Sequence, residues 1–91
     1  MGYKALLTLD LENEVSSKKR EKFYEYLKNE KWSNLPGLTT AWQCSYKEDV
    51  TRETAIRVAK NDVADASRHS GVSSYNAAVQ VGKSEIEKLQ V

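Results

Sequence analysis

The first residues of the chain alternate between apolar and largely polar side chains, as in a strand that buries one face. Residues 3–11 place Tyr3, Ala5, Leu7, Leu9 and Leu11 on one side of an extended chain. The other side carries Lys4, Leu6, Thr8 and Asp10. A period of two residues predicts a half-buried strand that ends beside acidic side chains.

Two later segments, residues 38–47 and 73–81, alternate in the same way. Their more apolar faces carry Leu38, Thr40, Trp42, Cys44 and Tyr46 in the first segment, and Tyr75, Ala77, Val79 and Val81 in the second. Pro36 and Gly37 favour a turn just before the first of these strands. Residues 31–35, ahead of that turn, are expected to form a short, degenerate partner strand.

Two segments between the strands are typical of helices. The first should begin at Ser16 or Ser17, because either hydroxyl can accept a hydrogen bond from an amide of the first turn. The second is predicted from about Thr51 to Ser70, with Gly71 as the left-handed stop residue. Its inward face consists mostly of small residues that would let it approach a sheet closely, namely Ile56, Ala59, Val63 and Ala66. A capping-box pattern from Ser84 to Glu87 predicts a further helical turn.

This order of elements predicts an α+β fold in which two helices cover one face of a mainly antiparallel sheet. We expect a ferredoxin-like βαββαβ sandwich with a degenerate second strand. The length of 91 residues predicts that it forms a single domain over residues 1–91.

Composition narrows the function classes. The chain is 40% hydrophobic and 30% charged, as in an ordinary globular protein. A net charge of +1 argues against a general nucleic-acid coat, which needs a clear excess of basic side chains. One cysteine, Cys44, is typical of a reducing compartment, and no apolar stretch has the length of a signal peptide or a membrane span. We therefore expect a cytoplasmic protein that does not bind membranes.

Two charged groups are candidates for function. Asp10, Glu12 and Glu14 follow the first strand, and Asp10 could supply one oxygen ligand to a metal such as Mg²⁺. The alternative is that these acids lie near a helix N-terminus, where negative charge is favourable.

The second group is a basic cluster in the first helix, formed by Lys18, Lys19, Arg20 and Lys22. Cations at a helix N-terminus oppose the helix dipole, so the cluster should face something acidic. A nucleic acid or an acidic partner protein fits, and so do the acids of the same chain. His69 is interpreted as a helix-end residue and Cys44 as a core residue. Cys44 is not expected to act as a nucleophile, because a cysteine nucleophile needs a base beside it.

The polar sheet face has no aromatic side chain, which disfavours an RNA reader that stacks bases on its sheet. Its small residues suit a second copy of the sheet, so we expect a homodimer that pairs through this open face.

A strand that ends in Asp10 and is followed by a basic helix resembles the small CRISPR-associated nucleases, the virulence-associated protein D toxins and small toxin–antitoxin ribonucleases. The resemblance covers the order of elements, and Asp10 is the residue that carries over. It implies a ferredoxin-like dimer in which Asp10 serves metal-dependent phosphodiester cleavage.

Two functions therefore stay open. One is a homodimeric binding or interaction protein that needs no cofactor. The other is a ribonuclease or deoxyribonuclease that uses Asp10 and Mg²⁺.

Overall fold

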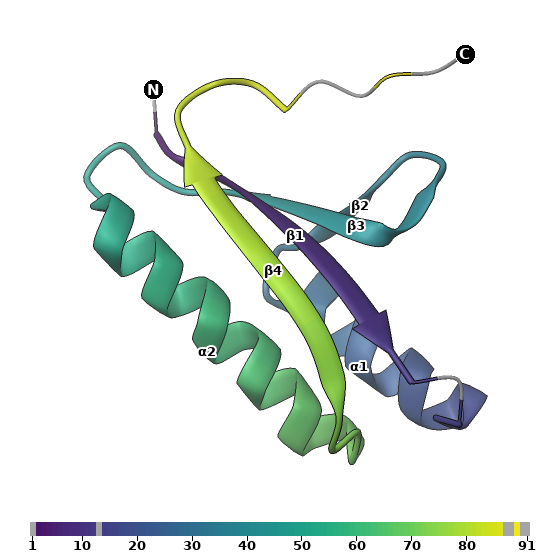
Figure 1. Cartoon of the computed structure of the whole chain (residues 1–91). Coiled ribbons are helices and arrows are strands. Elements are labelled where there is room, and N and C mark those ends of the chain that lie inside the picture. Colours follow the sequence, from purple (N-terminus) through teal and green to yellow (C-terminus); the bar gives the residue numbers. More distant parts are fainter. Residues whose placement is uncertain (1, 13, 87–88, 90–91) are drawn as a thin grey trace.

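The computed structural model describes residues 2–12, 14–86 and 89, and it confirms the predicted ferredoxin-like α+β architecture (Figure 1). The elements follow one another as β1 (Lys4–Leu11), α1 (Ser17–Asn29), β2 (Ser33–Leu35), β3 (Leu38–Ser45), α2 (Arg52–Ser70) and β4 (Tyr75–Gly82). The degenerate second strand is present as three residues. A register shift between Asn34 and Leu35 interrupts its pairing with β3.

The four strands form one antiparallel sheet in the order β2-β3-β1-β4. The first strand of the chain is thus central, with β3 on one side and β4 on the other. Its register runs from Lys4 opposite Gly82 to Leu11 opposite Tyr75 along β4. The long strand β4 and the short strand β2 form the two edges of the sheet.

Both helices pack on one face of the sheet, and the core lies between the two layers (Figure 1). The predicted inward alternation of β1 is confirmed, because its apolar face is buried at Ala5, Leu7, Leu9 and Leu11. The helices contribute Phe23, Leu27, Ala55, Ala59, Val63 and Ala66. Two tryptophans, Trp32 and Trp42, complete the core and are buried. In the part of the chain that the structure describes, no helix is long and apolar enough to cross a membrane.

The ends of the helices are fixed by local hydrogen bonds. Ser16 caps α1, because its hydroxyl accepts from the Lys19 amide at 3.3 Å. Thr51 caps α2 in the same way, accepting from Thr54. Gly71 ends α2 with a φ of 81°, a conformation that glycine adopts without a Cβ penalty.

The predicted turn near the C-terminus falls partly on Glu87, which lies outside the described residues. The described residues 83–86 contain no helix.

Candidate binding surfaces

Asp10 lies near the end of β1, where its side chain is exposed on the open face of the sheet and its backbone pairs with Asn76. A shallow hollow of about 240 Å³ surrounds it, lined by Thr8, Leu9, Asp10, Thr40, Asn76, Ala77 and Ala78. Among the described residues no three His, Cys, Asp or Glu side chains lie close enough to hold a metal ion. Among the described residues that line this hollow, Asp10 therefore has hydroxyl and amide oxygens as neighbours but no second carboxylate.

The other two candidate acids, Glu12 and Glu14, lie beyond the strand, beside the start of α1. The Glu12 carboxylate accepts a hydrogen bond from the Ser74 hydroxyl at 2.8 Å, which ties the end of β1 to the approach of β4. Its main-chain carbonyl accepts from the Arg20 guanidinium at 3.0 Å. The acidic strand end and the basic helix therefore meet through a carbonyl oxygen, and no ion pair joins their described side chains.

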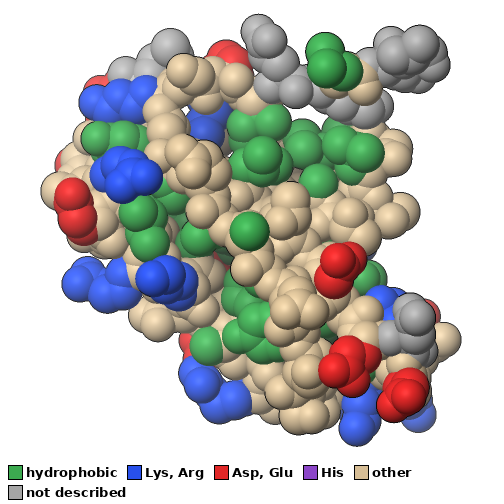
Figure 2. Space-filling view, in the orientation of Figure 1, with side chains coloured by type: hydrophobic (Ala, Val, Ile, Leu, Met, Phe, Trp, Pro, Cys, Tyr) green, Lys and Arg blue, Asp and Glu red, His purple; other side chains and the backbone are tan. Residues whose placement is uncertain are grey.

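The basic cluster is exposed at Lys18, Lys19 and Lys22, whereas Arg20 is half-buried. Figure 2 shows acidic side chains gathered where β1 ends, with basic side chains close by. Lys19 lines a shallow hollow with Glu12 and Glu14. The cluster thus combines exposed ammonium groups with acids of the same chain nearby. This geometry fits a nucleic acid or an acidic partner protein, and it also fits the acids of the same chain.

The open sheet face carries no aromatic side chain in the described strands. The aromatic rings instead pack on the helix side, where Trp42 lies 5.3 Å from the Tyr24 ring and Tyr75 lies 5.9 Å from the Phe23 ring, both between centroids. The face therefore lacks the stacking platform of a base-reading sheet. What it presents is a surface of mostly small or uncharged residues from β1, β3 and β4, with Lys4 and Asp10 as its charged members.

A buried polar cluster that sequence reasoning missed lies on the helix side of the sheet. The Trp32 indole donates to the Asp62 carboxylate at 2.9 Å. Burial raises the pKa of Asp62, and the hydrogen bond from Trp32 opposes that rise. The Tyr46 hydroxyl is buried without a hydrogen-bond partner among the described residues. Its pKa is raised by burial and then by the nearby Cys44 and Asp62. The sequence held one signal that could have revealed this cluster: Asp62 is a carboxylate directly before the inward-facing residue Val63.

Cys44 and His69 occupy the places predicted for them. Cys44 is buried, and burial raises the pKa of its thiol, which disfavours the reactive thiolate. His69 is exposed in the last turn of α2, with its ring 5.5 Å from that of Tyr26. The two residues therefore form no nucleophile–base pair.

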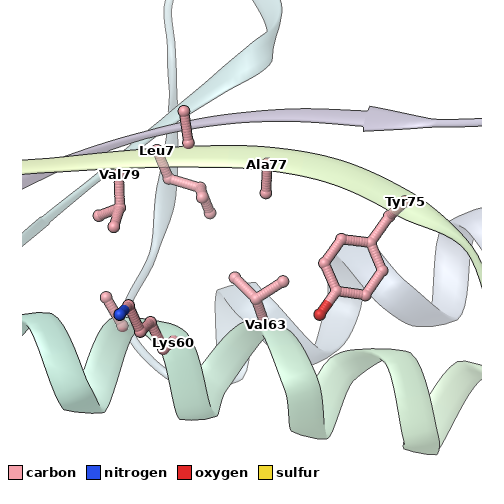
Figure 3. A pocket seen from close by; sticks show the side chains of 8 residues that line it. Leu7, Lys60, Val63, Tyr75, Ala77 and Val79 are labelled. Carbon is pink, nitrogen blue, oxygen red and sulfur yellow. The ribbon is translucent and has the colours of Figure 1, made fainter.

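An apolar groove separates α2 from β4, and this too was missed. The predicted inward residue Ala59 is buried against the sheet, and so is Ala55, which was not predicted, whereas the predicted Ile56 is only half-buried. Farther along, however, the helix leaves a space of about 210 Å³ beside β4. Figure 3 shows the side chains that line this groove, namely Leu7, Ala59, Lys60, Val63, Tyr75, Ala77, Ala78 and Val79.

Comparison with known proteins bears on the fold. No protein-family model matches the chain, and no curated protein matches it. Among solved structures it is similar to the crystal structure of protein SP2199 from Streptococcus pneumoniae, a structural genomics target. The TM-score is 0.56 at 14% sequence identity, covering 94% of this chain and 90% of the other. At this identity the likeness shows a shared fold, and a fold of this kind hosts many functions.

Proposed function

We propose that the protein is a homodimeric binding protein whose two copies pack through their open sheet faces. The observation that carries this proposal is a four-stranded sheet whose second face is covered by no described helix, while both helices lie on the first. Two such faces can stack as aligned layers, as in sheet sandwiches, about 10 Å apart.

The chemistry of the open face supports this packing. Its side chains are mostly small or uncharged, and they come from Lys4, Leu6, Thr8 and Asp10 of β1, Thr39, Ala41, Gln43 and Ser45 of β3, and Asn76, Ala78 and Gln80 of β4. Lys4 forms an ion pair with Glu85 at 3.0 Å, so part of its charge is neutralised within the chain. Apart from Asp10 near its end, a face of this kind can be desolvated at low electrostatic cost.

Sedimentation of the Thr8→Glu variant tests the proposal. Thr8 is exposed at the centre of the open face, and a glutamate there would place like charges across the interface. We expect the wild-type protein to sediment as a dimer and the variant as a monomer. Asn61→Glu adds the same charge at an exposed position of α2 and should leave the dimer intact. A wild-type chain that remains monomeric at high micromolar concentration would contradict the proposal.

A second candidate function is a metal-dependent ribonuclease or deoxyribonuclease, which is favoured by the position of Asp10 on the open sheet face. Asp10 lies on the open face, so face-to-face pairing would bring two copies of the hollow around it into one interface. Mg²⁺ binds carboxylate oxygens together with water or substrate phosphate, and a second Asp10 would supply the carboxylate that one protomer lacks.

Incubation with end-labelled single-stranded RNA and DNA, in Mg²⁺ or Mn²⁺, separates the two functions. Cleavage that is lost in Asp10→Asn but kept in Glu14→Ala would establish the nuclease and overturn a purely binding role. Intact substrates under every metal condition would remove the nuclease candidate.

A further inference from the structure

We propose that the groove between β4 and α2 binds an extended, apolar segment of another protein, which adds as a fifth strand to the edge of the sheet. This binding site lies on the helix side of β4, meets the hollow of the open face at Ala77 and Ala78, and goes beyond the proposed dimer. Three features support the proposal: an edge with free main-chain groups, an apolar groove beside it, and basic residues along its rim.

The main-chain groups of β4 that face outward can be identified from the hydrogen bonding between β1 and its other neighbour, β3. The Tyr46 amide donates to the Tyr3 carbonyl at 2.9 Å, so the odd-numbered residues of β1 direct their main-chain groups toward β3. Because these groups alternate along a strand, the even-numbered residues of β1 face β4. Their partners in β4 are also even-numbered. Tyr75, Ala77, Val79 and Val81 therefore direct theirs to the free edge.

A contact at the end of β4 agrees with this assignment. The Val81 carbonyl accepts a hydrogen bond from Arg52 of α2 at 3.1 Å, so it points away from β1, as the assignment requires, and Arg52 already occupies it. In the part of the chain that the structure describes, no strand pairs with this edge.

The edge carries none of the usual protection. Proteins commonly block exposed strand edges with charged residues, proline or bulges. β4 spans eight residues without charge or proline, and its register with β1 runs unbroken. The opposite edge, β2, is only three residues long. An edge this long and this accessible can accept another strand.

The side chains of the same outward-facing residues form one wall of the groove. Figure 3 shows Tyr75, Ala77 and Val79 pointing from β4 toward α2, with Val63 opposite them. In Figure 2 hydrophobic side chains reach the surface where α2 and β4 face each other. An added strand would place every second side chain over this groove, which is how strand addition obtains specificity.

Charge determines which occupant fits. Lys60 is the one charged residue among those that line the groove, and Arg52 lies on the same side of α2. An acidic side chain within an apolar segment would pair with them. The β4 strand of a second copy has no acidic residue to offer, so a different protein segment fits better.

A labelled peptide of about nine residues, in which threonine alternates with valine and glutamate replaces the central valine, is a suitable probe. Fluorescence anisotropy should show binding to the full-length protein below about 1 mM. A peptide with lysine in place of the glutamate should bind about fivefold more weakly. A peptide N-methylated at alternate amides should not bind, because it cannot complete the hydrogen bonds of a strand.

Variants localise the site. Lys60→Glu should reverse the preference between the glutamate and lysine peptides, whereas Lys28→Glu on α1 should leave it unchanged. Ala77→Glu, at an exposed position of β4, should weaken binding about tenfold by filling the groove with a charge. Circular dichroism checks that each variant is folded.

The proposal is overturned if the glutamate peptide fails to bind, or if its affinity is the same after Ala77→Glu. Loss of a wild-type dimer in Ala77→Glu would show that a second copy occupies the edge, which would also overturn it. A protein that is monomeric yet binds the peptide would contradict the open-face dimer and leave this inference intact.

Discussion

The Asp62 carboxylate accepts a hydrogen bond from the Trp32 indole and is partly buried. Burial favours its uncharged form, so its pKa in the folded protein lies above the ordinary value of 3.8. An acid whose pKa is raised by folding contributes stability below its unfolded pKa. That contribution is lost as the pH rises through the folded value.

The Asp62→Asn variant should therefore gain stability relative to the wild type as the pH rises. Asparagine keeps an oxygen that can accept from the indole, but it never acquires the charge. Urea unfolding should give equal free energies of unfolding well below the ordinary aspartate pKa of 3.8, and an advantage for the variant that grows until the pH passes the raised folded value and then stays constant. Asp49→Asn controls for the loss of one negative charge at an exposed position. A difference that does not change with pH would contradict this account of Asp62.

At the scale of elements, the adjacent serines Ser16 and Ser17 have different roles at the start of α1. Ser16 is the N-cap of α1, whereas Ser17 is its first helical residue. Replacing an N-cap serine with alanine typically costs about 1 kcal/mol of stability. We expect Ser16→Ala to lose about that much and Ser17→Ala to change little, since alanine is a good helix former. Chemical unfolding of the two variants measures the difference, and equal losses would argue against the observed cap.

The accuracy of sequence reasoning differs between elements for a physical reason. The caps at Ser16 and Thr51 and the stop at Gly71 depend on hydrogen bonds within a few residues, so their signals are local. Strand faces follow from alternation, which is also local. The groove beside β4 and the contact from Trp32 to Asp62 depend on how far separate elements stand from one another. No pattern within a single segment encodes that distance.

The same reasoning explains what the sequence indicated about Asp10. Alternation placed Asp10 on the polar face at the end of the first strand, and the structure has it there. Which groups surround it depends on residues brought from β3 and β4, namely Thr40 and Asn76. The hollow around Asp10 therefore could not be predicted from the sequence, because it depends on the order of the strands in the sheet.

At the scale of the whole molecule, the open face and the groove beside β4 lie on opposite faces of one sheet and meet at Ala77 and Ala78. We expect them to act independently. Thr8→Glu should abolish the dimer and leave peptide affinity within about twofold of the wild type, while Ala77→Glu should weaken the peptide and leave the dimer. Sedimentation and anisotropy on both variants check this. If either substitution removed both dimerisation and peptide binding, the two activities would depend on one shared surface.

The pairing of β1 with β4 also constrains how the chain is made. The first of the four strands to be synthesised, β1, lies at the centre of this sheet, and one of its two neighbours, β4, is the last of the four. Until residues 75–82 emerge, the nascent β1 has one unpaired side. Contacts between such distant parts of a chain form slowly, because a long loop must close first. The sheet is therefore completed only after residues 75–82 have emerged, and a nascent chain that stalls before β4 would leave its own core partly uncovered.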